Sequence, residues 1–131
     1  MNLDDLLSLL REEFALDVPS TTLALAQARL DPATAPLHLD PMLGFIERSI
    51  QASSLMGLHG WGGFLQQIAE FAAMQSSQPD AVSLAWLEGW MQPAQVYLEA
   101  PADGHTTDAI LDYLRACPQS PDDAVLDFLR D

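Results

Sequence analysis

Apolar residues recur every three or four positions along almost the whole chain, and no stretch alternates polar and apolar residues for long. A spacing of three or four places side chains on one face of an α-helix, whereas alternation would indicate a β-strand. The sequence therefore predicts an all-α protein, an antiparallel bundle of about six or seven helices joined by short connections. With 131 residues, the chain fits a single helical domain over residues 1–131 that can bury roughly two-thirds of its unfolded surface.

The first forty residues predict two helices and a proline-rich connection. Residues 2–15 carry a helical row of apolar side chains, and Asn2 is expected to cap this helix. The inward row is Leu3, Leu6, Leu7, Leu10 and Phe14. Pro19 is expected to break the chain before a short second helix over residues 23–30, and the three prolines of residues 31–41 predict a connection.

The middle of the chain predicts three longer helices. One begins at Pro41 and stops at Gly57, since glycine readily takes the left-handed conformation that ends a helix. The next covers residues 59–75, and a third covers residues 81–99, with a kink at Pro93 because proline has no N–H to donate. The inward row of the second of these helices is Trp61, Phe64, Leu65, Ile68, Phe71 and Ala72.

The end of the chain contains a short repeat. The sequence Asp-Ala-Ile-Leu-Asp-Tyr-Leu-Arg at residues 108–115 recurs as Asp-Ala-Val-Leu-Asp-Phe-Leu-Arg at residues 123–130. Both copies have helical periodicity, with acidic residues early and arginine late, which suits the helix dipole. Residues 105–131 are therefore expected to form a C-terminal helical hairpin packed on the end of the bundle.

Charge and hydropathy exclude several classes of partner. The chain has 19 acidic residues against five arginines, no lysine, and a net charge of −14. Nucleic acids and anionic membranes both need a basic surface, so neither is expected as a partner. No apolar run reaches the ~20 residues of a membrane-spanning helix, and the N-terminus lacks the basic start of a signal peptide. Cys117 has no second cysteine to pair with, so a cytoplasmic location is expected.

No pattern typical of a catalytic, cofactor or metal site is present. The histidines, His38, His59 and His105, lie in or beside breaks in the helical pattern, and only His105 is followed at helical spacing by an acidic residue, Asp108. Residues 57–63 are rich in glycine but lack the lysine and hydroxyl of a phosphate loop, so they are expected to let two helices meet closely. We therefore expect no catalytic residue, no cofactor and no metal, and hence no enzyme.

The segment around Gly57 has a distinctive pattern. A helix with small residues in its second half ends in Met56-Gly57-Leu58, and a second amphipathic helix follows. This resembles the central hairpin of histidine-phosphotransfer (HPt) domains, whose first helix ends in a similar Leu-Gly-Leu corner. Residues 87–101 are similar to the HPt-like N-terminal regions of chemotaxis-type hybrid histidine kinases and of FimL-like proteins of type IV pilus chemosensory systems. The resemblance covers residues 41–101 and implies a four-helix, HPt-like core and a role in two-component signalling.

The reactive residue of that family is missing. An active HPt domain carries a solvent-facing histidine a few helical turns before the corner glycine, with a Lys-Gly step soon after it. Glu47 and Arg48 occupy that region here, and the chain has no lysine. The resemblance therefore implies a member that has lost phosphotransfer and acts as a binding module. Its possible interaction surface is Glu47, Arg48, Gln51 and Ser54.

We predict a non-catalytic protein-interaction domain, an HPt-like pseudo-phosphotransfer module whose partner is a signalling or pilus-regulatory protein. One alternative is an active phosphotransferase that uses His59, or else His105, as its phosphoacceptor. Another is an acidic immunity protein or DNA mimic that binds a basic partner, because the chain is strongly negative.

Overall fold

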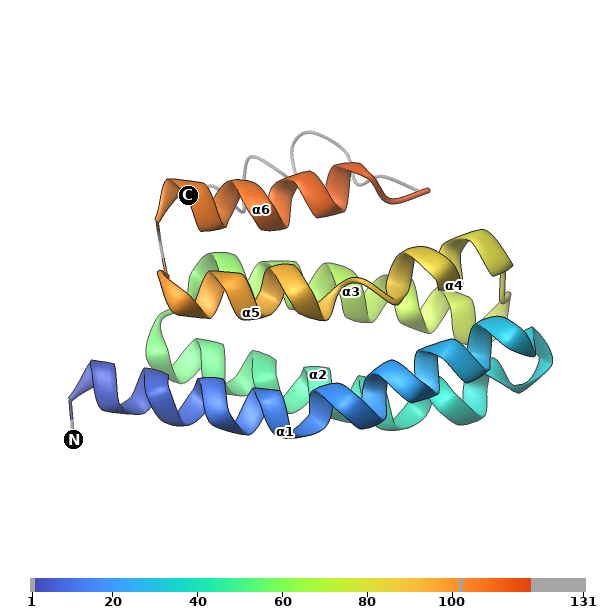
Figure 1. Cartoon of the computed structure of the whole chain (residues 1–131), viewed down its shortest axis with the longest axis horizontal. Helices are drawn as coiled ribbons and strands as arrows, with labels where there is room; N and C mark the ends of the chain where they lie inside the picture. Colours follow the sequence, from blue (N-terminus) through green and yellow to red (C-terminus); the bar gives the residue numbers. More distant parts are fainter. Residues whose placement is uncertain (1, 102, 119–131) are drawn as a thin grey trace.

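The structure, a computed structural model, describes residues 2–101 and 103–118, and these form an all-helical bundle (Figure 1). Helices α1 and α2 form one layer, α3 and the pair α4–α5 form the next, and α6 lies outside them against α5 and α3. The predicted all-α bundle is confirmed, and the described residues contain no strand. The elements are α1 (Leu3–Leu30), the 3-10 helix η1 (Pro32–Thr34), α2 (Ala35–Met56), α3 (His59–Ser77), α4 (Ala81–Leu87), α5 (Met91–Glu99) and α6 (Gly104–Arg115).

The described residues make five helical rods, because α4 and α5 are two parts of one interrupted rod. The sequence predicted six or seven helices. Two of those, over residues 2–15 and 23–30, are joined into α1, and the expected helix over residues 123–130 lies outside the described residues. All five rods contribute side chains to one core, which therefore extends beyond the expected core at residues 41–101.

Helix α1 continues through Pro19, so the predicted break at this residue is wrong. A proline inside a helix removes one backbone hydrogen bond, here the one to the Ala15 carbonyl, at a cost of about 3 kcal/mol. Burial on both sides of the proline offsets this cost, since Phe14 and Leu25 both belong to the core. Pro19 itself is exposed, and the ribbon of α1 bends near its middle (Figure 1).

The proline-rich segment over residues 31–41 is largely helical, which corrects the predicted connection. Only η1 separates α1 from α2. Pro36 lies in the first turn of α2, where a backbone N–H would have no helical partner. Pro41 lies inside α2 and is exposed, whereas Leu39 and Met42 are buried beside it. Packing of the inward row therefore outweighs the one hydrogen bond lost at Pro41.

The expected helix over residues 81–99 is interrupted, although not at Pro93. A turn over residues 88–90 separates α4 from α5. Pro93 consequently lies in the first turn of α5, where proline is tolerated. The carbonyl of Gly89, with which the proline ring would clash in a continuous helix, lies in the turn. The interruption of the rod therefore lies about one helical turn before Pro93 rather than at the proline itself.

Four aromatic rings meet at the centre of the bundle, and they come from four different rods. The centroid of the Phe14 ring lies 4.9 Å from that of Phe45, 5.6 Å from that of Trp61 and 5.9 Å from that of Trp90. The two tryptophan contacts are edge-to-face, a geometry that contributes about 0.5–1.5 kcal/mol beyond area burial. This cluster ties α1, α2, α3 and the α4–α5 rod together.

The indole N–H group of each central tryptophan donates a hydrogen bond within the core. The Trp61 indole N–H donates to the Ala94 carbonyl at 3.1 Å, and that of Trp90 donates to the Met42 sulfur at 3.3 Å. The predicted inward row of α3 is confirmed, because all six of its residues are buried.

The start of α1 differs from the prediction. Leu10 and Phe14 of the expected inward row are buried, but Leu3 and Leu6 are exposed. Figure 1 shows why: the N-terminal turns of α1 extend beyond the other helices, so no partner covers them.

Helix α6 runs antiparallel to α5 along the side of the bundle, rather than on its end as predicted (Figure 1). Trp86 of α4 and Tyr113 of α6 stack with ring centroids 4.4 Å apart. The indole N–H of Trp86 donates to the Tyr113 carbonyl at 3.2 Å, and the Tyr113 hydroxyl donates to the Trp86 carbonyl. This reciprocal pair fastens α6 to α4. The second half of the expected hairpin lies outside the described residues.

Candidate interaction surface

The hairpin of α2 and α3 turns within two residues. Gly57 has a φ of 71°, the left-handed conformation that glycine adopts without strain, and it ends α2 as predicted. The backbone N–H of Leu58 donates to the Ser53 carbonyl at 2.9 Å, which satisfies one of the last carbonyls of α2. Helix α3 begins at the next residue, so the corner is short and closed by backbone hydrogen bonds.

The two helices approach very closely beside the corner. A Cβ atom on Gly62 would lie only 2.4 Å from the Ser53 hydroxyl oxygen, so a larger residue would require the Ser53 side chain or one of the two helices to move. That hydroxyl is itself held, because it donates to the Ile50 carbonyl at 2.7 Å. The expectation that glycines in this segment let two helices meet is confirmed at Gly62.

A hollow of about 330 Å³ opens to solvent at this corner. Its lining combines exposed polar groups with the buried side chain of Leu58. An open hollow of this kind differs from the enclosed, mostly apolar pockets that bury small ligands, and suits a side chain presented by a protein partner. The lining residues are Ile50, Ser53, Ser54, Gly57, Leu58, His59, Gly62, Gly63 and Gln66.

The structure brings three of the four predicted surface residues into one row. Glu47, Gln51 and Ser54 are exposed on α2 at helical spacing, and Ser54 reaches the hollow. Arg48 is also exposed but points toward α1, where its Nη2 lies 3.5 Å from Oδ2 of Asp17. Both side chains of that pair are well exposed, so it contributes little to stability.

His59 and Gln66 join this surface from α3. Both are exposed and both line the hollow. Gln66 was not among the surface residues predicted from the sequence. Its position two helical turns after His59 places the two residues on one face of α3, so helical spacing measured from His59 would have found it.

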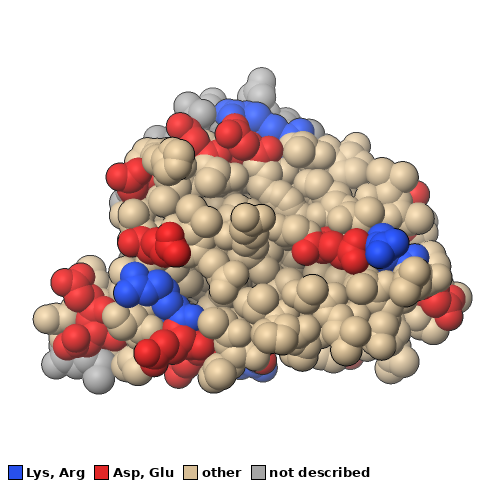
Figure 2. Space-filling view, viewed as in Figure 1, with Lys and Arg blue, Asp and Glu red and all other residues tan. Residues whose placement is uncertain are grey.

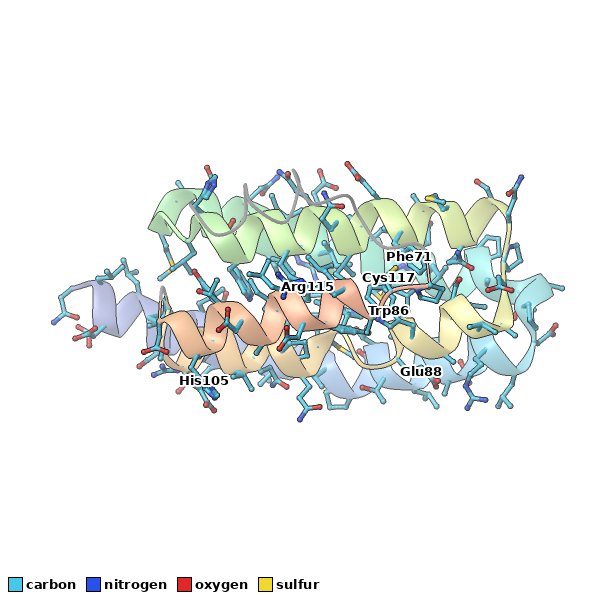
Figure 3. The ribbon with its side chains drawn as sticks, turned by 90° about the horizontal axis from the view of Figure 1, so that it is seen from above. Phe71, Trp86, Glu88, His105, Arg115 and Cys117 are labelled. Carbon is cyan, nitrogen blue, oxygen red and sulfur yellow. The ribbon has the colours of Figure 1, made fainter. Side chains whose placement is uncertain are left out.

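The three histidines lie apart from one another. His38 is half-buried near the start of α2, His59 is at the corner, and His105 is exposed at the start of α6. The residues that the structure describes contain no group of three His, Cys, Asp or Glu side chains that could hold a metal ion. Figure 3 shows His105 at the opposite end of α6 from Cys117.

Cys117 belongs to a second, smaller hollow of about 100 Å³ between α3, α4 and the end of α6. Phe71, Trp86 and Cys117 lie together there (Figure 3), and Cys117 is buried. The Phe71 and Trp86 rings meet edge-on with centroids 5.0 Å apart. A buried thiol in such surroundings acts as a small apolar side chain.

Tyr113 is the titratable group that its surroundings perturb most clearly. Burial raises the pKa of the Tyr113 hydroxyl well above its usual range, a backbone hydrogen bond at Gly89 opposes that rise, and Cys117 adds to it. The group therefore stays neutral and serves as a hydrogen-bond donor within the fold.

Four arginines lie within the described residues, and each has a partner. Arg29 Nε lies 2.7 Å from Glu88 Oε2, and Arg11 donates to the Leu98 carbonyl at 3.1 Å. Arg48 pairs with Asp17, as described above, and Arg115 pairs with a neighbour on its own helix. On the face shown in Figure 2, the acidic side chains form several separate groups rather than one continuous field.

Comparison of the chain with protein-family models, with curated proteins and with solved structures gives no match. Among the described helices, none combines the length and the hydropathy needed to cross a membrane.

Proposed function

We propose that this chain is a non-catalytic protein-interaction domain that binds its partner through the outer face of α2 and the hollow at the α2–α3 corner. The observation that carries the proposal is the exposed row of Glu47, Gln51 and Ser54, which leads into that hollow. The row stands on a hairpin held by backbone hydrogen bonds and by the close Gly62–Ser53 contact. Side chains on rigid helices keep a fixed geometry, as a specific interface requires.

Within this proposal, the domain is an HPt-like pseudo-phosphotransfer module of cytoplasmic two-component signalling or type IV pilus chemosensory regulation. The support is the Met56-Gly57-Leu58 corner together with the glutamate in the region where that family presents its histidine. Glu47 is exposed on the outer face of α2, so it is available to a docked partner. A receiver domain is the partner class that such a module would bind.

Binding is tested by titrating the isotopically labelled chain with the receiver domains encoded in the same genome, with amide chemical shifts as the readout. We expect the largest shifts at Glu47, Gln51, Ser54 and His59. Gln51→Arg should weaken binding at least tenfold. Gln92→Arg is the matched control, because Gln92 is an exposed glutamine on α5, away from this surface. Shifts confined to other helices, or equal effects of the two variants, would contradict the proposal.

Loss of phosphotransfer is tested separately. The chain is incubated with receiver domains that carry a phosphoryl group on their aspartate, and the products are tested for a label that is stable in base and lost in acid. We expect no such label on the chain.

An active phosphotransferase is the second candidate, because the exposed His59 lines the hollow in which a partner's side chain would lie. In that case the P–O bond of the aspartyl phosphate breaks as a P–N bond forms to a His59 ring nitrogen, and the aspartate leaves as a carboxylate. The imidazole releases its N–H proton to solvent. A label that His59→Ala abolishes and His105→Ala preserves would establish this function in place of the first.

A further inference from the structure

The outer face of α1 carries a regular row of exposed leucines. The row consists of residues at intervals of seven, namely Leu9, Leu16, Leu23 and Leu30. In this order they are 44%, 79%, 60% and 75% exposed. Seven residues are close to two helical turns, so these four side chains share one face. Large apolar residues on a monomer surface are usually scattered singly, whereas a contiguous row marks an interaction site.

The residues between the leucines complete the pattern over the second half of α1. Pro19 and Ala26 come three residues after Leu16 and Leu23. Apolar residues therefore alternate at intervals of three and four from Leu16 to Leu30, as along the seam of a coiled coil. Such a seam indicates that the partner is another helix.

This face also differs from the rest of the chain in charge. The chain has 19 acidic residues in 131, yet residues 18–30 contain none. The only charged side chain in that stretch is Arg29, which is held by Glu88 at 2.7 Å. The earlier half of α1 is acidic, with Asp4, Asp5, Glu12, Glu13 and Asp17 against the single Arg11. In Figure 2, charged side chains gather over the N-terminal part of α1, and the part of α1 that follows is mostly uncharged.

We infer that the outer face of α1 forms a homodimer interface, in which α1 packs antiparallel to α1 of a second copy about a two-fold axis midway between Leu16 and Leu23. This arrangement sets Leu9 against Leu30 of the second copy and Leu16 against its Leu23, which makes the interface self-complementary. The acidic half of each helix then faces the uncharged half of its partner. A parallel arrangement would instead set Glu12 and Glu13 against their own copies, and like charges there oppose association.

Residues 18–30 of α1 carry no carboxylates. This stretch is therefore a better contact for a second copy of this acidic chain than the parts of its surface that carry acidic side chains. The row from Leu9 to Leu30 is about 32 Å long at 1.5 Å per residue. A face of that length and ~10–12 Å width buries on the order of 400 Å² per copy, at the low end for specific interfaces. We therefore expect a weak, reversible dimer with a Kd on the order of 10 µM. Glu47, Gln51 and Ser54 lie outside this interface, so a dimer would present two copies of the proposed α2 surface.

Sedimentation equilibrium of the full chain over about 2–500 µM, a range that brackets the expected Kd, tests the dimer. We expect the average mass to rise toward that of two chains. Leu23→Glu should keep the chain monomeric throughout, because it sets a carboxylate against Leu16 of the second copy, next to Asp17 of that copy. Leu55→Glu is the matched control: Leu55 is 89% exposed on α2, and its substitution should leave the dimer intact. A far-UV circular dichroism spectrum shows that each variant is folded.

Disulfide trapping tests the orientation in a Cys117→Ser background. A mixture of Leu16→Cys and Leu23→Cys chains should cross-link efficiently, whereas Leu16→Cys alone should not. Self-cross-linking of Leu16→Cys would indicate a parallel pair and overturn the proposed geometry. A chain that stays monomeric up to 500 µM, or a dimer that survives Leu23→Glu, would overturn the interface itself; so would another protein that occupies this face in place of a second copy.

Discussion

Two leucines of α1, two residues apart, have opposite environments. Leu25 is completely buried against the core, whereas Leu23 is 60% exposed on the outer face of the same helix. Their hydropathy is identical, so the difference comes only from the direction in which the helix presents each side chain. Inner positions of this bundle are fixed by packing, and outer positions are free to carry an interaction with something else. Substitutions at inner and outer positions should therefore have very different effects on stability.

The largest effect is expected from Leu25→Ala. Removing a fully buried leucine side chain leaves a cavity in the core and should cost about 2–5 kcal/mol in the free energy of unfolding. Leu23→Ala, at low protein concentration, should cost less than about 0.5 kcal/mol. Urea unfolding followed by tryptophan fluorescence measures both. Similar losses for the two variants would break the division between inner and outer faces.

A second inner position is Gly62, which lies against Ser53. Gly62→Ala should cost roughly 1–2 kcal/mol, because the strain of the new Cβ atom exceeds the helix propensity gained. Gly44→Ala is the matched control. No atom lies within 4 Å of a Cβ at Gly44, so this change should stabilise the helix by about 0.5–1 kcal/mol. Adding Ser53→Ala to Gly62→Ala should recover most of the loss, and no recovery would contradict the assigned contact.

Tyr113 makes the inner face sensitive to alkaline pH. Its pKa is raised in the folded state, so below about pH 10 folded and unfolded chains are both protonated and stability is complete. Above that pH the unfolded chain loses the proton while the folded chain keeps it, so stability should fall by about 1 kcal/mol between pH 10 and 11. The chain has no lysine, so few other groups titrate there. Tyr113→Phe should flatten this part of the profile; an unchanged slope would assign it to another group.

The smallest effect is expected at a helix end on the surface. Oδ2 of Asp80 accepts hydrogen bonds from the backbone N–H of Ser83 at 3.0 Å and from its hydroxyl at 2.9 Å. Asp80→Ala should therefore cost roughly 0.5–1 kcal/mol. Asp31 also precedes a short helix, but its side chain makes no capping hydrogen bond, and Asp31→Ala should be close to neutral. Equal effects of these two changes would show that capping does not account for the loss.

Local signals in the sequence predicted several parts of the fold. Asn2 caps α1 as expected, Gly57 ends α2, and the inward row of α3 is buried throughout. Each of these depends on residues within one or two turns of each other. The prolines did not follow local expectation. Pro19 and Pro41 lie inside helices because core residues on both sides hold the backbone in place, and a sequence pattern does not reveal that support.

The candidate surface likewise has one part that was predicted from the sequence and another that depends on tertiary contacts. The resemblance to HPt domains suggested Glu47, Arg48, Gln51 and Ser54 as a surface, and the structure has three of them exposed in one row on α2. The direction of Arg48 depends on Asp17, which is on another helix, and the hollow needs α3 to fold back against α2. These features arise from tertiary contacts, so they followed only from the structure.

The three tryptophans give this protein built-in optical reporters of separate contacts. The Trp61 indole N–H donates to Ala94 between α3 and α5, Trp90 donates to Met42 between the α4–α5 rod and α2, and Trp86 donates to Tyr113 between α4 and α6. In a variant that retains only one tryptophan, the emission wavelength would report the hydration of the helix–helix contact at that residue. The fluorescence transitions of such variants would therefore distinguish detachment of α6 from opening of the central bundle.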